Sequence, residues 1–201
     1  MEEFPPLVAR AHALARQAGF PLTREQADPG RPSACLPGAG RFLAVLAAGC
    51  TGGRIGELGT GAGIGTAWIA DAMPANCTLI TAEIDERLAS VARGLLADDP
   101  RIEVITGDAL HALPGRGPFD LLFADSGVRD DADFAALISW LRMGGRIVMD
   151  DVTPEQVLPP DSPLRQDDPK RRFFGTEPRL VCTEVVLPDL RNSLLVGTRT
   201  N

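Results

Sequence analysis

The sequence predicts an α/β fold, a doubly wound parallel sheet with helices on both faces that ends in an antiparallel hairpin. From residue 54 onwards, short apolar runs alternate with stretches of helical periodicity, which is the pattern of a parallel sheet covered on both sides. Residues 180–187 and 193–198 depart from this pattern, because residues 188–192 between them are too few for a crossover helix. These two runs therefore predict the hairpin.

The N-terminal part is expected to form a helix and a loop before the sheet begins. Residues 4–19 place apolar side chains at helical spacing, with Gly19 as a stop signal. Residues 21–37 hold four prolines, which favour a loop or an irregular lid. The length of 201 residues fits a single domain, with this segment at residues 1–39 and a core at residues 40–201.

The core is expected to follow a regular order of elements. A helix that closes at Gly49 comes first, and then strands are short apolar runs and helices are amphipathic stretches. Gly144 and Gly145 are expected to end the last helix. The expected helices are residues 40–48, 64–73, 86–97 and 134–141, and the expected strands are residues 54–58, 77–83, 102–105, 119–124, 146–149, 180–187 and 193–198.

Composition argues against several classes of protein. The chain has 20 Lys+Arg against 27 Asp+Glu and a formal net charge of -7, which argues against a general nucleic-acid binder. No apolar run approaches the ~20 residues that span a bilayer, and the first residues lack the pattern of a secretory signal. The 4 cysteines are far apart, so we expect free thiols in a reducing cytoplasm.

The most informative segment is a glycine-rich turn after the first strand of the core. Its glycines allow a sharp turn and bring backbone amides close to a ligand at a helix N-terminus. Glu57 helps to decide which ligand this turn binds. Its carboxylate would repel a pyrophosphate, whereas it suits a ligand with an ammonium and a sulfonium. The alternative is a surface acid beside a tight turn. The segment reads Glu57-Leu58-Gly59-Thr60-Gly61-Ala62-Gly63-Ile64-Gly65.

Further acids follow the next strands. Glu83 ends the second strand and can accept both hydrogen bonds of a ribose diol. Asp85 is expected to cap the next helix. Asp108 could accept a hydrogen bond from an exocyclic adenine amine or act as another helix cap. The acids form a row across strand ends, where open α/β sheets bind ligands.

Five motifs occur in order along the chain, at residues 57–63 (ELGTGAG), 82–85 (AEID), 107–109 (GDA), 119–125 (FDLLFAD) and 141–148 (LRMGGRIV). Together they resemble the Rossmann-like S-adenosylmethionine-dependent methyltransferases. Within that family the sequence is most similar to the small O-methyltransferases of the catechol and caffeoyl-CoA type. The resemblance covers about residues 40–200 and leaves the N-terminal segment uninterpreted.

The resemblance implies a seven-stranded sheet in the order 3-2-1-4-5-7-6 with its last strand antiparallel. It implies S-adenosyl-L-methionine as cofactor, with Glu57 near the methionine amine, Glu83 on the ribose, and Asp108 and Ala109 at the adenine. A small hydroxylated acceptor and a homodimer are further expectations, with no nucleic-acid or membrane partner. The full set of expected cofactor residues is Glu57, Gly59, Thr60, Gly61, Gly63, Glu83, Ile84, Asp108, Ala109 and Asp125.

Three aspartates at strand ends suggest a divalent cation. Asp125 follows the fourth strand, and Asp150 and Asp151 follow the fifth, so the three carboxylates could converge. All-oxygen ligation suits Mg²⁺, Mn²⁺ or Ca²⁺. The similar O-methyltransferases use Asp, Asp and Asn at these places, so Asp151 stands where they have asparagine. A bound ion would ease deprotonation of the acceptor hydroxyl before its in-line attack on the sulfonium methyl.

One departure from the family pattern concerns the general base. The catechol-type enzymes have a lysine three residues after the first metal aspartate, where this chain has Val128. Arg129 is too basic to accept a proton and would instead orient or stabilise an anion, so Asp125 and Arg129 are the expected catalytic residues. His12 and His111 are alternative bases in principle.

Other functions stay open at this point. The cofactor could serve N-methylation or RNA methylation without a metal, although net acidity argues against RNA. A non-catalytic protein that binds the cofactor is another alternative, because the lysine is missing. An NAD-linked oxidoreductase is disfavoured by Glu57 and by the absence of tyrosine from the chain.

Overall fold

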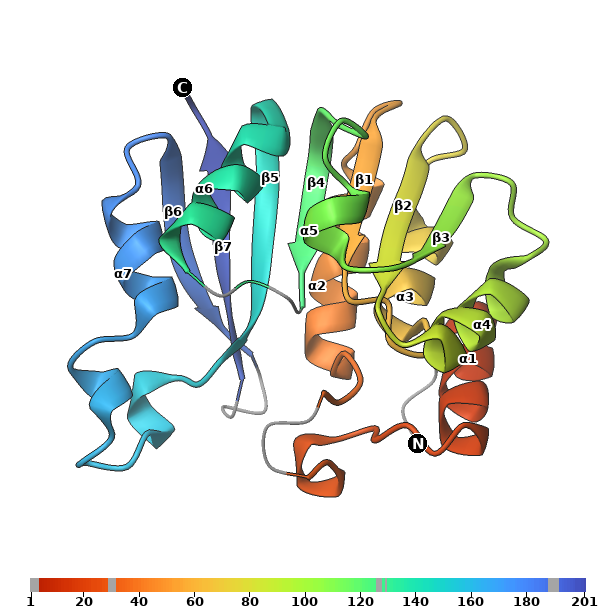
Figure 1. Cartoon of the computed structure of the whole chain (residues 1–201), viewed down its shortest axis with the longest axis horizontal. Coiled ribbons are helices and arrows are strands. Elements are labelled where there is room, and N and C mark those ends of the chain that lie inside the picture. The colour runs from red at the N-terminus through yellow and green to blue at the C-terminus, as the bar shows by residue number, and fades with distance from the viewer. Residues whose placement is uncertain (1–3, 29–31, 126–127, 129, 188–191) are drawn as a thin grey trace.

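The computed structural model describes residues 4–28, 32–125, 128, 130–187 and 192–201 (Figure 1). Its centre is a seven-stranded sheet in the order β3-β2-β1-β4-β5-β7-β6. The first five strands are parallel to one another, and β7 runs antiparallel to both β5 and β6. The doubly wound sheet, its strand order and its C-terminal hairpin are therefore confirmed.

Strands and helices alternate along the core. The strands are β1 (Arg54–Leu58), β2 (Thr78–Glu83), β3 (Ile102–Thr106), β4 (Phe119–Ala124), β5 (Leu141–Val152), β6 (Leu180–Val186) and β7 (Ser193–Arg199). The α-helices are α1 (Pro6–Gln17), α2 (Pro37–Ala48), α3 (Ile64–Ala72), α4 (Glu86–Leu96), α5 (Ala109–Ala112), α6 (Asp131–Trp140) and α7 (Pro169–Thr176). Short 3₁₀ turns are η1 (Arg24–Gln26), η2 (Glu155–Val157) and η3 (Pro163–Arg165).

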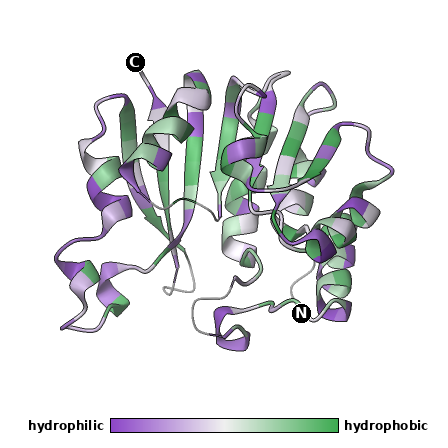
Figure 2. Cartoon of the chain, in the orientation of Figure 1, coloured by the Kyte–Doolittle hydropathy of each residue, from purple (hydrophilic) through white to green (hydrophobic). Residues whose placement is uncertain are grey.

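The helices form one layer on each face of the sheet. Side chains of α1 to α4 pack with Ile55, Leu121 and Phe123 in one apolar cluster. Side chains of α5 to α7 pack with Leu58 and Leu122 in a second cluster on the opposite face. Figure 2 shows the hydrophobic residues concentrated along the central strands, with hydrophilic residues on the outer helices and loops. The near-continuous apolar strands follow from this burial on both faces.

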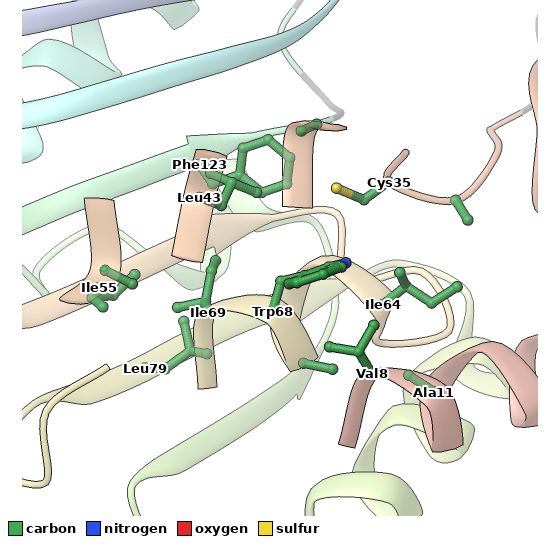
Figure 3. Packing of buried hydrophobic residues seen from close by; sticks show 14 of the residues in the cluster. Val8, Ala11, Cys35, Leu43, Ile55, Ile64, Trp68, Ile69, Leu79 and Phe123 are labelled. Carbon is green, nitrogen blue, oxygen red and sulfur yellow. The ribbon is translucent and has the colours of Figure 1, made fainter. Parts of the chain in front are cut away.

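Trp68 occupies the middle of the first cluster, between α1, α2 and the sheet (Figure 3). It is 4% exposed and belongs to the core. Gly40 on α2 makes room for it, because a Cβ at Gly40 would lie 2.2 Å from the indole Cδ1. The guanidinium of Arg41 lies 5.5 Å from the centre of the indole ring.

Most expected boundaries agree with the structure to within three residues, and the fifth strand differs more. The sequence placed the last expected helix at residues 134–141, but α6 begins at Asp131 because Asp130 caps it through the amides of Ala132 and Asp133. The four-residue helix α5 was not among the expected helices, although a cap at Asp108 was one of the two alternatives for that residue.

The fifth strand is longer than the sequence predicted. Gly144 and Gly145 lie inside β5 rather than after a helix, in the stretch where the pairing with β4 shifts register. Leu141 pairs with Phe119 on one side of this irregularity, and Arg146 pairs with Leu121 on the other. Asp150 and Asp151 consequently belong to β5 itself and do not follow it, which corrects the expected strand of residues 146–149.

Among the described residues, no α-helix has the length and hydrophobicity needed to span a bilayer.

Candidate active site

A cavity with about 680 Å³ of empty space, part of it open solvent, lies at the carboxyl edge of the sheet. The ends of β1, β2, β4 and β5 supply one side, and the N-terminal segment after α1 supplies the other (Figure 1). The lining residues are Phe20, Pro32, Ser33, Ala34, Cys35, Glu57, Gly59, Thr60, Gly61, Ala62, Ile64, Gly65, Glu83, Ile84, Leu88, Asp125 and Asp151.

The glycine-rich turn forms the floor of this cavity in a way that only glycine permits. Gly59, Gly61 and Gly63 have φ of 90°, 54° and 89°. Residues that carry a side chain rarely adopt this left-handed backbone conformation. The amides of Gly59 and Thr60 donate to the carbonyl oxygen of Ala82, and the amide of Gly63 donates to that of Thr60. These amides therefore bond within the protein. From the sequence, backbone amides of the turn were instead expected to lie close to a ligand.

Glu57 is fully buried at the wall of the cavity. Its Oε2 accepts hydrogen bonds of 2.6 Å from the hydroxyls of Thr66 and Thr81. Since Thr81 donates its only hydrogen to Glu57, the hydroxyl of Thr60, 2.6 Å away, must donate to Thr81. Thr60 therefore supports Glu57 with its side chain.

The second oxygen of Glu57 has no hydrogen-bond partner in the described part of the chain. It lies against Gly65, where a Cβ would come within 2.8 Å of it. Burial, opposed by the hydrogen bonds from Thr66 and Thr81, raises the pKa of Glu57 to about 7. An unpartnered buried acceptor costs about 1–3 kcal/mol, so this oxygen is suited to a cationic donor entering the cavity.

Glu83 connects the end of β2 to the glycine turn. Its Oε2 accepts from the amide of Gly61 at 2.8 Å, and its Oε1 accepts from the amide of Asp85 at 2.9 Å. Each oxygen keeps a lone pair for a further donor from the cavity. Ile84 beside it is 72% exposed and lines the cavity, so it presents an apolar surface that a flat ring could cover.

Asp125 and Asp151 line the end of the cavity next to β4 and β5. Burial raises the pKa of Asp125 well above its usual range, and the charges of Asp150, Asp151 and Glu57 raise it further. Among the described residues, no hydrogen bond is made to the Asp125 side chain. Asp150 is 3% exposed, and its Oδ1 accepts from Asn192 Nδ2 and from the amide of Asp151, both at 2.7 Å.

These aspartates do not form a metal centre in this arrangement. Across the described ranges, no three His, Cys, Asp or Glu side chains are grouped so that they could hold a metal ion. Asp151 Oδ1 instead lies 2.5 Å from Nη2 of Arg24, and one oxygen of Asp150 is engaged by Asn192. The residues present therefore do not fit the divalent cation that the sequence suggested.

Comparisons with known proteins place this architecture in a family. A model for a methyltransferase domain matches residues 57–152. A catechol O-methyltransferase of Niastella koreensis is 37% identical over 146 residues, which span 65% of this chain and 63% of that enzyme. A putative O-methyltransferase of Mycolicibacterium smegmatis is 30% identical over 68% of this chain and 69% of its own length. The O-methyltransferase of Bacillus cereus in complex with SAH has a TM-score of 0.73 at 25% identity, over 100% of this chain and 93% of that one.

The chain belongs to the S-adenosylmethionine-dependent O-methyltransferase family.

Several residues that were expected from the sequence at a cofactor site do not line the cavity. Asp108 caps α5 by accepting from the amide of Leu110 at 2.9 Å, and Ala109 begins that helix. Gly63 is the N-terminal cap of α3, and a Cβ there would lie 3.1 Å from Leu95. Asp108 is thus a helix cap, which was the second of its two expected roles. Asp85 caps α4, as expected.

Other residues that the sequence did not single out also line the cavity. Phe20 packs on the glycine turn, since a Cβ at Gly61 would lie 3.1 Å from the end of its ring. Pro32 to Cys35 form a wall, and Leu88 of α4 contributes from the other side. A proline-rich stretch gives no periodic signal, so only its position after α1 could have indicated this role.

The position of the family lysine is filled by an apolar side chain. Val128 is partly buried against the second cluster of the core. The ring of His12 stacks on that of Phe4, with 4.6 Å between the ring centres. The side chain of His111 is 86% exposed and lies beside Asp108. Neither histidine lines the cavity. Arg129 lies outside the described residues.

Proposed function

We propose that this chain transfers the methyl group of S-adenosylmethionine to a hydroxyl oxygen of a small molecule. The observation that carries the proposal is the buried Glu57, which lines the cavity and has one oxygen without a partner in the described part of the chain while the other is held by two threonines. An ammonium group supplies the charge that this site lacks. A pyrophosphate would be repelled by Glu57 and Glu83 together.

In this proposal the cofactor lies along the carboxyl edge of the sheet. Its amino acid end is near Glu57, its ribose diol donates to Glu83, and its adenine covers Ile84. The alternation of charge and apolar surface along the cavity supports this direction, because Glu57 and Asp125 line one part and Ile84 and Leu88 another. The sulfonium then lies towards Asp125 and Asp151.

The transfer is an in-line displacement between two bound molecules. The acceptor oxygen forms a bond to the methyl carbon while the carbon–sulfur bond breaks, and the electron pair of that bond goes to sulfur. The hydroxyl proton leaves the acceptor through a hydrogen bond to Asp125. Alignment of two reactants can lower a barrier by about 7–11 kcal/mol. No step passes through a metal ion, because the aspartates do not fit one.

Titration calorimetry with S-adenosylhomocysteine tests the cofactor assignment. We expect Glu83→Ala to weaken binding by a factor of about 10 to 100, since hydrogen bonds to a charged group contribute about 1.5–3 kcal/mol. Glu103→Ala is the matched control, because Glu103 lies on β3 and pairs with Arg116 away from the cavity. Equal affinity of the two variants would refute the ribose assignment.

Turnover decides between the proposal and the alternatives. With radiolabelled S-adenosylmethionine, we expect label in the methyl ether of an aromatic diol such as catechol. Label in an amine or in RNA, or cofactor binding with no product from any acceptor, would contradict O-methylation.

A further inference from the structure

Arg24 reaches from the N-terminal segment to the acidic end of β5. Its Nη2 donates to Oδ1 of Asp151 at 2.5 Å and to Oδ1 of Asn192 at 3.2 Å. Asp151 has a left-handed backbone, with φ of 61°, and the pairing of β5 with β7 shifts register between Met149 and Val152. The guanidinium therefore joins three separate segments at the point where β5 becomes irregular.

A second cation supports the same edge. Nζ of Lys170 on α7 donates to the backbone carbonyl oxygens of Asp150 at 2.8 Å and Asp151 at 3.3 Å. Asp150 is further engaged by Asn192. Arg24 and Lys170 thus place two positive charges beside Asp150 and Asp151 at the end of β5.

Arg24 is connected to the cavity through its own segment of the chain and through its partner Asp151. Arg24 belongs to η1, a few residues before the wall formed by Pro32 to Cys35, and its partner Asp151 lines the cavity. A guanidinium keeps its charge at all ordinary pH values and directs its donors at carboxylate and amide oxygens. A metal ion would have to displace it from Asp151.

We propose that Arg24 is the resident cation of this site, in place of a divalent metal, and that it positions Asp151 at the acceptor end of the cavity. The inference rests on the proposed methyl transfer, which would then need no added metal. Arg24 acts through Asp151 and is a positioning residue. The Arg24 and Asp151 side chains are 38% and 55% exposed, so the pair contributes little to stability and its loss leaves the fold intact.

Titration of the protein with Mn²⁺ alone, followed by calorimetry, tests this inference. We expect the wild type to show no binding up to about 1 mM Mn²⁺, the weak end of oxygen-ligand sites. Arg24→Gln removes the charge and releases Asp151, so it should bind Mn²⁺ at least tenfold more tightly. Arg24→Lys keeps the charge and should exclude Mn²⁺ as the wild type does.

Arg116→Gln is the matched control, because Arg116 also forms a partly exposed pair, with Glu103, but lies away from the cavity. It should bind Mn²⁺ no better than the wild type. The inference is overturned if the wild type binds Mn²⁺ at micromolar concentration, if Arg24→Gln gains nothing over Arg116→Gln, or if Arg24→Lys binds Mn²⁺ as Arg24→Gln does.

Titration of the same samples with S-adenosylhomocysteine keeps the two proposals apart. A wild type that binds this nucleoside and also Mn²⁺ would leave the methyltransferase proposal standing and remove the role of Arg24. A wild type that binds neither would contradict the proposed function itself.

Discussion

Glu57 combines full burial with a carboxylate that only two threonine hydroxyls stabilise. Its pKa of about 7 in the folded protein lies above the ordinary value of 4.5. Between these values the folded state holds a proton that the unfolded state has released, so folding weakens as pH rises through this range. The residue that suits a cationic ligand is therefore a source of instability in the empty protein.

Glu57→Gln should remove this pH dependence. Because 1 pKa unit corresponds to about 1.36 kcal/mol, the variant should exceed the wild type in free energy of unfolding by about 3 kcal/mol at pH 8, and the two should converge near pH 4. Urea denaturation at several pH values measures the difference. A difference that is the same at every pH would show that burial of this carboxylate has no such cost.

Cofactor affinity should depend on the same proton. If the ammonium of S-adenosylhomocysteine binds the ionised form of Glu57, affinity should rise about tenfold per pH unit up to about pH 7 and then level off. Calorimetry on Glu57→Gln should give weaker binding with a flat pH profile. A wild-type profile without this slope would place the ammonium elsewhere.

The contact between α2 and α3 depends on the absence of a side chain at Gly40. A Cβ there would overlap the Trp68 indole at 2.2 Å, and Trp68 is enclosed by the first apolar cluster. Gly94 on α4 is also helical, but nothing lies within 4 Å of a Cβ at that position. The two glycines thus share a backbone conformation and differ in packing.

Gly40→Ala and Gly94→Ala should change stability in opposite directions. Overpacking against Trp68 should cost about 1–3 kcal/mol, whereas Gly94→Ala should add up to about 1 kcal/mol from helix propensity. Urea denaturation of both variants measures the signs. Stabilisation by both substitutions would mean that α2 can move away from Trp68 without loss.

Element boundaries show where local sequence signals are insufficient. Gly144 and Gly145 are typical of the end of a helix, yet β5 incorporates them because Leu141 and Arg146 both pair with β4. The helix capped by Asp85 began where its sequence indicated, since an aspartate cap acts within its own turn. Cross-strand pairing depends on the neighbouring strand and cannot be inferred from one segment.

The cavity draws on the whole molecule, because the N-terminal segment and four strands of the sheet enclose it. A ligand that contacts both sides should stabilise the entire fold. At S-adenosylhomocysteine concentrations 100 times Kd, binding should add about 2.7 kcal/mol and raise the unfolding midpoint by about 5–10 °C. Differential scanning calorimetry measures this shift, and Glu83→Ala should show a smaller one than Glu103→Ala at the same concentration. No shift in the wild type would mean that the ligand does not bind this fold.

The sequence alone determined the strand order and the row of acids at the strand ends. Strand and turn patterns are local, and the resemblance carried by five short motifs supplied the order of the strands. Glu57, Glu83 and Asp125 could be named because each lies at or next to the end of a strand, and parallel strands bring such residues to one edge.

Only the tertiary structure decided what surrounds those acids. The contact of Arg24 with Asp151 joins residues 127 positions apart, and the wall from Pro32 to Cys35 lies in a stretch without periodicity. Whether three aspartates converge on a metal or are neutralised by an arginine depends on where a distant loop settles. The position of the loop that carries Arg24 depends on packing and charge across the whole fold. It cannot be predicted from the residues that neighbour Arg24 or Asp151 in the sequence.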